Sequence, residues 1–255
     1  MNVLLLGDIF GSPGRGVVAQ HLPGLKEEYQ PALIVANGEN AAGGFGLTKK
    51  VAEELFGLGI HVLTSGNHIW DQKEMYTYIN EEPRILRPAN YPPSVPGASV
   101  FIHRTHDAVV AVVNLIGRVF MADYDCPFRQ ADQILSELPN EVTHVIIDFH
   151  AEATSEKIAL ARYLDGRISA LVGTHTHVLT ADEQILPKGT AYITDLGMCG
   201  PIHGILGVEP DVVINKFLTQ LPARFAVAKG VPCLTGVVIT LDEKGSAKRI
   251  VRLKL

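Results

Sequence analysis

The sequence predicts a layered α/β fold, a sandwich of β-sheets flanked by helices, on three observations. Short apolar runs alternate with helix-like segments over most of the chain. Five of these runs end at polar side chains, which is typical of buried strands whose carboxyl ends form a site. Two strand-like segments near the end are joined by a turn and add an antiparallel part. With 255 residues, 47% hydrophobic and 19% charged, and no linker-like tract, we expect one domain over residues 1–255.

The first third of the chain contains three units of strand followed by helix. Each apolar run is short and ends at glycine or at polar residues, as buried strands do. Thr48 is expected to cap the second helix, and Gly57 to end it. Strands are expected at 3–6, 33–36 and 61–64, and helices at about 15–29, 48–56 and 72–79.

The remainder continues the pattern after an irregular crossing that five prolines between residues 83 and 96 predict. The continuous β-branched run at 109–115 is typical of a buried strand. The glycine-rich stretch 197–207 is interpreted as a surface loop, with a pocket lining as the alternative. Further strands are expected at 99–103, 143–149, 170–177 and 191–194, helices at 129–138, 155–164 and 211–220, and a closing hairpin at 233–241 and 247–253.

Charge and cysteine content limit the cellular setting. The net charge is -5 and the basic residues form no cluster, which argues against binding to duplex nucleic acid. The opening apolar run is short and has no basic leader, so we expect neither a signal peptide nor a membrane span. Three widely separated cysteines without a CxxC pair favour a reducing, cytoplasmic location. The composition leaves homo-oligomerisation open.

Polar side chains stand at the ends of five expected strands. Each has an ordinary structural explanation when taken alone, such as a helix cap for Asp8 or a hydrogen-bonded core position for His150. Because the carboxyl ends of such strands gather at one edge of a sheet, we expect the five ends to form one site. Asp148, two residues before His150, either orients a ligand or is a satisfied buried carboxylate. The residues at the five ends are Asp8, Glu39 with Asn40, Asn67 with His68, His150, and His175 with His177.

Two carboxylates, two amides and three imidazoles suit a pair of borderline divalent ions better than a thiolate-bound zinc or an all-oxygen calcium site. Two divalent ions opposed only by Asp8 and Glu39 keep a net charge of about +2. Such a centre attracts phosphate and lowers the pKa of a bound water from about 15.7 toward roughly 7. The residue set therefore predicts hydrolysis of a phosphoester.

In order along the chain, these residues resemble the motifs of the calcineurin-like metallophosphoesterases. That family has GD-x-H-G, GD, GNH, a lone histidine and G-H-T/S-H; this chain has GDIFG at 7–11, GEN at 38–40, GNH at 66–68, His150 and GTHTH at 173–177. Two positions depart from the pattern: Phe10 stands in place of a ligating histidine, and Glu39 in place of the bridging aspartate. GDIFG together with NGEN is similar to the YmdB-type branch, bacterial enzymes that hydrolyse 2′,3′-cyclic nucleotides.

The resemblance implies a four-layer sandwich of two mixed β-sheets flanked by helices and a dinuclear centre with iron or manganese as the expected metals, with zinc, cobalt and magnesium as alternatives. It also implies that Asn40 replaces the missing histidine. The implied ligands are Asp8, Asn40 and His177 for one metal, Asn67, His150 and His175 for the other, and Glu39 as the bridge. The implied substrate is a small cyclic nucleotide.

His68 follows a ligand but is not itself counted among the ligands, and imidazole can transfer protons near neutral pH. We therefore expect a metal-bound hydroxide to attack phosphorus and His68 to act as general acid toward the leaving oxygen. A histidine that only orients its neighbours is the alternative.

These residues are also compatible with other functions. The same metal pair would serve a phosphomonoesterase, a phosphoprotein phosphatase or a nuclease. A metal-loaded binding or regulatory module with little catalysis is the alternative outside enzymes.

Overall fold

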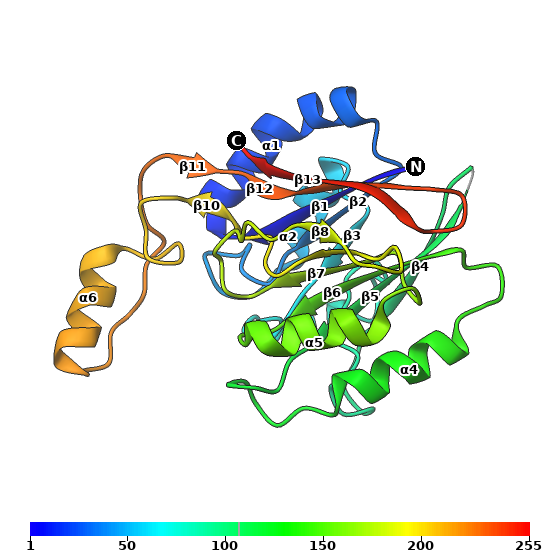
Figure 1. Cartoon of the computed structure of the whole chain (residues 1–255). Helices are drawn as coiled ribbons and strands as arrows, with labels where there is room; N and C mark the ends of the chain where they lie inside the picture. Colours follow the sequence, from blue (N-terminus) through cyan, green and yellow to red (C-terminus); the bar gives the residue numbers. More distant parts are fainter. Residues whose placement is uncertain (107) are drawn as a thin grey trace.

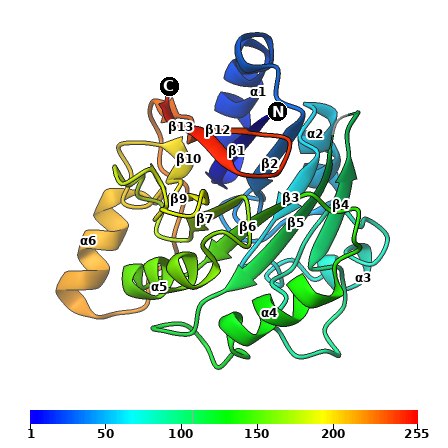
Figure 2. The ribbon, with the colours of Figure 1, turned by 45° about the vertical axis from the view of Figure 1, so that its right-hand side comes forward.

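Two β-sheets pack face to face between helices in the computed structural model, which describes residues 1–106 and 108–255 (Figure 1). Helices α1 and α2 cover the outer face of the first sheet, and α4 and α5 cover the outer face of the second (Figure 2). The predicted four-layer α/β sandwich of two mixed sheets is therefore confirmed.

The first sheet is built around β1, which pairs in parallel with β2 and β10 and antiparallel with β12. β3 extends it beyond β2, and the predicted C-terminal hairpin is formed by β12 and β13. Its strands are β1 (Asn2–Ile9), β2 (Leu33–Asn37), β3 (Val62–Thr64), β10 (Met198–Pro201), β11 (Pro232–Cys233), β12 (Thr235–Leu241) and β13 (Ala247–Lys254).

The second sheet has the order β4-β5-β6-β7-β9-β8. Its central strands β5, β6, β7 and β9 run parallel, and the two outer strands β4 and β8 are antiparallel to their neighbours. Its strands are β4 (Val100–Arg104), β5 (Val109–Ile116), β6 (His144–His150), β7 (Ala170–Thr174), β8 (Gln184–Ile185) and β9 (Ala191–Ile193).

The helices lie close to the expected ranges. The Thr48 hydroxyl caps α2 by accepting a hydrogen bond from the backbone N–H of Val51 at 3.3 Å, as predicted. The helix expected at 72–79 is reduced to the single turn α3. The helices are α1 (Gly11–Tyr29), α2 (Lys49–Gly57), α3 (Met75–Tyr78), α4 (Pro127–Glu137), α5 (Thr154–Leu164) and α6 (Pro210–Thr219). None of the helices in the described part of the chain has the length and apolar character that a membrane crossing needs.

Alternation along β1 shows how one strand serves two apolar layers. Leu4 and Leu6 are buried in the layer that contains α1, whereas Val3 and Leu5 are buried between the two sheets. This follows from the two-residue period of a strand, which turns successive side chains to opposite faces. The layer between the sheets joins them through their inner faces.

Two expectations about glycine-containing segments were wrong. β1 was expected to stop at Gly7, but it continues and pairs Asp8 with Met198 of β10. The strand can continue because Gly7 has no Cβ; a Cβ there would lie 2.2 Å from the carbonyl oxygen of Gly197. The stretch 197–207 was interpreted as a surface loop, but it contains β10, which is buried beside β1. Its alternative interpretation, a pocket lining, is confirmed for Ile205 and Leu206. Met-Cys-Gly-Pro has a weak strand pattern and becomes a strand only through this pairing.

Candidate metal centre

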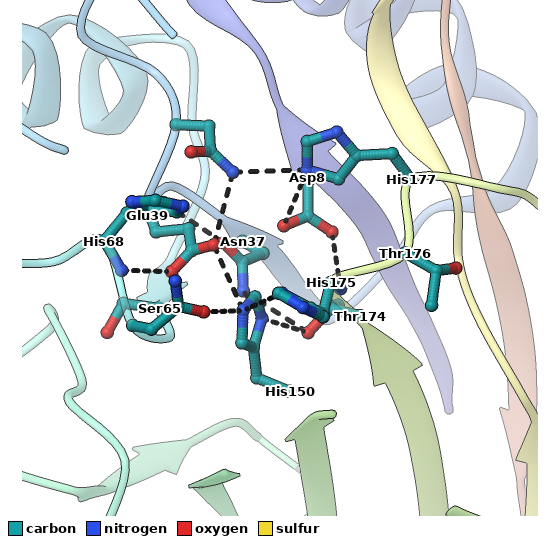
Figure 3. Close-up of polar contacts among 12 residues, drawn as sticks. Asp8, Asn37, Glu39, Ser65, His68, His150, Thr174, His175, Thr176 and His177 are labelled. Carbon is teal, nitrogen blue, oxygen red and sulfur yellow. Dashed lines mark hydrogen bonds and ion pairs between the residues drawn. The ribbon is translucent and has the colours of Figure 1, made fainter. Parts of the chain in front are cut away.

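The eight side chains expected at the site meet at the carboxyl ends of strands from the two sheets. Figure 3 shows six of them: Asp8, Glu39, His68, His150, His175 and His177. Both sheets contribute, so the site lies where their edges come together. Asp8 lies near the end of β1, Glu39 and Asn40 follow β2, Asn67 and His68 follow β3, His150 ends β6, and His175 and His177 follow β7.

Glu39 lies at the middle of this cluster and is fully buried. Its Oε1 is 3.1 Å from Nε2 of His150 and accepts a hydrogen bond from Nδ2 of Asn40 at 3.2 Å. Its Oε2 accepts the backbone N–H of His68 at 2.9 Å. The carboxylate therefore contacts residues of both expected ligand groups.

One group gathers around Nε2 of His150, which is also fully buried. This atom lies 3.1 Å from Oδ1 of Asn67 and 3.0 Å from Nδ1 of His175. Ligand atoms of Glu39, His150 and His175 all lie within 4.8 Å of one another, close enough to share one ion.

The other group consists of Asp8, Asn40 and His177. Nε2 of His177 lies 3.2 Å from Nδ2 of Asn40 and 3.7 Å from Oδ1 of Asp8. Burial alone would raise the pKa of the Asp8 carboxyl, but the nearby His177 and His150 lower it to about 2. Turning the Asn40 amide about its last torsion would exchange its nitrogen for its oxygen at the same place.

The backbone that carries the two C-terminal histidines is strained. β7 ends at Thr174, and His175 and His177 have φ angles of 100° and 63°, in the left-handed region. The Asp195 carboxylate accepts the N–H of Thr176 between them at 3.1 Å. The buried ammonium of Lys157 holds both Asp195, at 2.7 Å, and the Thr174 carbonyl, at 2.9 Å. This buried ion pair fixes the turn that presents both imidazoles.

A hydrogen-bond chain sets the tautomer of His150. The Thr174 hydroxyl donates to the Asp148 carboxylate at 2.7 Å, so its oxygen accepts from Nδ1–H of His150 at 3.0 Å. Burial raises the pKa of Asp148 to about 6, which leaves it ionised at neutral pH. In the neutral imidazole, Nε2 of His150 then carries the lone pair on the side of the cluster. Of the two interpretations of Asp148, this contact favours the one in which it orients a ligand.

His177 is oriented in the same way. Its Nδ1 donates to the carbonyl oxygen of Leu206 at 3.1 Å, so that in the neutral imidazole the Nε2 lone pair faces Asp8 and Asn40. Two histidines from different strands thus direct their Nε2 atoms into one buried space.

The arrangement fits a bound cation. Without a proton on Nε2, His150 faces the carboxylate of Glu39, the amide oxygen of Asn67 and a nitrogen of His175, all acceptors or lone pairs at 3.0–3.1 Å. Oδ1 of Asp8 is buried and has no hydrogen-bond partner within the described residues. Buried groups of this kind are costly unless a positive charge satisfies them. Mixed nitrogen and oxygen donors suit borderline divalent metals.

His68 lies beside the cluster and is partly exposed. Its Nδ1 is 2.8 Å from Oδ2 of Asp71, and its ring packs edge-to-face with Phe45 at 5.4 Å between centroids. It also lines a cavity that opens next to the expected ligands. A histidine at this position can exchange a proton with a molecule in the cavity.

Sequence reasoning did not assign a role to Thr174, Lys157 or Asp195. Thr174 stands inside the GTHTH motif, so its position was visible although its contact was not. Lys157 lies on α5 and gives no signal of burial, because a lysine on a helix is ordinarily exposed.

Comparison with known proteins finds relatives that cover the whole of this chain. The model of the family described as "YmdB-like protein" matches residues 4–253. A "2′,3′-cyclic-nucleotide 2′-phosphodiesterase" of Bacillus subtilis (strain 168) is 49% identical over 254 residues, covering 100% of this chain and 96% of that protein. A hypothetical protein from Thermus thermophilus has a crystal structure with a TM-score of 0.95 and 42% identity, covering 100% of this chain and 99% of that one. The structure of a novel phosphatase from Mycoplasma pneumoniae also has a TM-score of 0.95, with 33% identity and coverage of 100% and 93%.

Proposed function

The chain belongs to the YmdB-like protein family, and we propose that it is a phosphoric ester hydrolase that opens 2′,3′-cyclic nucleotides with two bound metal ions. The proposal is supported most directly by Nε2 of His150, which lies 3.0–3.1 Å from three further potential metal-ligand atoms. The Bacillus subtilis relative, matched over nearly its whole length, gives the substrate class. A net positive centre suits a small anionic phosphodiester.

The proposed ligands are Asp8, Asn40 and His177 for one ion and Asn67, His150 and His175 for the other, with Glu39 shared between them. Iron or manganese is the proposed occupant, since nitrogen and oxygen donors are mixed here. When bound, two such ions would neutralise the phosphate oxygens and acidify a water molecule.

His68 is the proposed general acid. The Asp71 carboxylate accepts from its Nδ1 at 2.8 Å and orients the ring, and Nε2 remains available to give a proton to the leaving ribose oxygen. The backbone N–H of His68 binds Glu39, so the ring is anchored to the centre without using its nitrogens.

Replacement of His68 by alanine tests this role. We expect kcat on a 2′,3′-cyclic nucleotide to fall roughly 100- to 10,000-fold, because the leaving oxygen loses its proton donor. Metal content, measured by elemental analysis of protein purified without chelator, should stay at the wild-type level. His21→Ala, on α1, is the matched control and should retain activity. Unchanged turnover in His68→Ala would remove His68 from the mechanism.

A substrate panel tests the reaction itself. Metal-loaded protein is assayed on cyclic nucleotides, linear diesters, monoesters and a phosphopeptide. We expect the highest kcat/KM on 2′,3′-cyclic nucleotides. A preference for monoesters, phosphopeptides or linear diesters would instead assign the centre to a phosphatase or nuclease, and absence of hydrolysis with both metals bound would favour a binding module.

A further inference from the structure

A cavity of about 350 Å³ opens beside the metal centre, a size within the range of small-molecule sites. At one end it is lined by the expected metal-site residues, including Glu39, His68 and His177. Its other end is apolar, and among the described residues that line this end none is charged. The apolar end includes Leu206, Val213, Phe217 and Phe225.

Phe10 forms the junction between the two ends. It is buried, and its ring contacts that of His177 edge-to-face at 5.6 Å between centroids. Gly207, at φ 90°, allows this placement, because a Cβ there would lie 2.6 Å from the Phe10 ring. A phenylalanine next to a ligand histidine thus makes the cavity wall continuous from the metal centre to the apolar end.

The outer wall comes from α6, which projects from the edge of the sandwich (Figures 1 and 2). Val213 is the buried residue of this helix. Phe217 is 74% exposed although it lines the cavity, and Lys216 lies 4.7 Å from the centroid of the Phe225 ring. An exposed aromatic ring at a cavity is typical of a surface that a ligand covers.

The two ends match the two parts of a nucleotide. The metal end suits an anionic phosphate, and the aromatic end suits a flat, uncharged base, which stacks on phenylalanine rings. An acyl chain would fit the apolar end but has no group that would bind the adjoining metal centre. A second copy of the protein docked there would have to leave that centre open to substrate. Continuity with the metal end therefore favours a nucleobase.

We propose that the apolar end of this cavity is the base-binding subsite of the enzyme, with Phe217 as a residue that determines preference for nucleotides over cyclic phosphates without a base. This inference rests on the proposed function. Because stacking uses the ring faces that all bases share, the subsite should accept both purines and pyrimidines. Purines should bind more tightly, because their rings have a larger area.

Phe217→Ala tests the subsite, and Leu218→Ala is the matched control, since Leu218 is the adjacent residue, is 80% exposed and does not line the cavity. Both variants are assayed on 2′,3′-cyclic AMP and on glycerol 1,2-cyclic phosphate, which has the five-membered ring and no base. We expect Phe217→Ala to lower the ratio of kcat/KM for the nucleotide over the glycerol ester about tenfold, mainly through KM. Leu218→Ala should change this ratio less than twofold.

Binding of adenosine, which has no phosphate, separates the subsite from the reaction. Titration followed by NMR should show adenosine binding to the wild type and to Leu218→Ala, and at least fivefold weaker binding to Phe217→Ala. If adenosine binds in this way but cyclic nucleotides are not hydrolysed, the subsite stands and the proposed reaction fails. An unchanged substrate ratio in Phe217→Ala overturns the subsite. If the oligomeric state of Phe217→Ala also changes while this ratio does not, α6 is an interface between copies of the chain.

Discussion

At the scale of single residues, the Thr174 hydroxyl has the most consequential position outside the proposed ligands. It links the Asp148 carboxylate to Nδ1 of His150, and it can do so only by donating to one and accepting from the other. The tautomer of a proposed metal ligand is therefore fixed by a residue that would not touch the metal.

We predict that Thr174→Val weakens metal binding about tenfold or more, because His150 loses the acceptor that holds its tautomer. Affinity is measured by competition with a chelator. Thr64→Val is the matched control: Thr64 also donates to Asp148 but does not contact His150, so this variant should lose stability and keep most of its metal affinity. Thr174→Ser should restore binding. Equal affinities in Thr174→Val and the wild type would contradict the assigned tautomer.

The proposed ligands can be predicted from the sequence more readily than the residues that support them. Glu39, His150 and the other proposed ligands stand at strand ends in recognisable motifs, and the structure brings these side chains together. The contact of Lys157 with Asp195 joins segments 38 positions apart. It depends on how α5 packs on the second sheet, which no local pattern encodes.

At the scale of elements, strands with apolar, β-branched sequences were predicted closely, and those that depend on a partner were missed. β5 has such a sequence and appears where expected. β10 contains glycine and proline and is a strand because it pairs with the end of β1 and with β11. The β12–β13 hairpin was predictable because its turn, 242–246, contains aspartate, glycine and serine, which favour turns.

That turn is organised by Asp242, whose Oδ1 accepts the N–H groups of Lys244 and Ser246, each at 2.9 Å. Its Oδ2 pairs with Nζ of Lys248 at 2.9 Å, and chiefly this contact lowers the pKa of the carboxyl to about 2. A carboxyl with a lowered pKa stabilises the fold above its unfolded-state value, near 4, and loses that contribution as the pH falls toward 2.

We therefore predict that Asp242→Asn lowers the Tm at neutral pH, and that the difference from the wild type shrinks between about pH 4 and pH 2. Thermal unfolding of both proteins across this range measures the difference. Glu243→Gln, which removes the same charge at an exposed neighbour, is the control and should not reproduce the pH dependence. A Tm difference that stays constant down to pH 2 would contradict the assigned role of Asp242.

At the scale of the whole molecule, the proposed ligands connect the two sheets. Asp8 and Glu39 extend from the first sheet, and His150 and His175 from the second. The layer between the sheets is a single apolar cluster to which both contribute, among others Leu5 of β1 and Val112 of β5. Since the core and the proposed centre both span the two sheets, we propose that residues 1–255 unfold as one domain.

Removal of the metals tests this coupling. Ions that bind only the folded chain stabilise it by about 2.7 kcal/mol when present at a hundred times their Kd. For a chain of this size, each ion bound in this way corresponds to a Tm roughly 5–10 °C higher than that of the chelated protein. Scanning calorimetry should therefore show one transition in both states, shifted upward by manganese.

Calcium at the same ionic strength is the control and should raise the Tm much less, because histidine nitrogens are poor ligands for it. Two separate transitions would mean that the sheets unfold independently and would contradict the single domain. An equal shift with calcium would contradict a centre of mixed nitrogen and oxygen donors, since only a site dominated by oxygen would fail to distinguish the two ions. A shift that depends on the metal, in a transition that stays single, is what a centre held by both sheets requires.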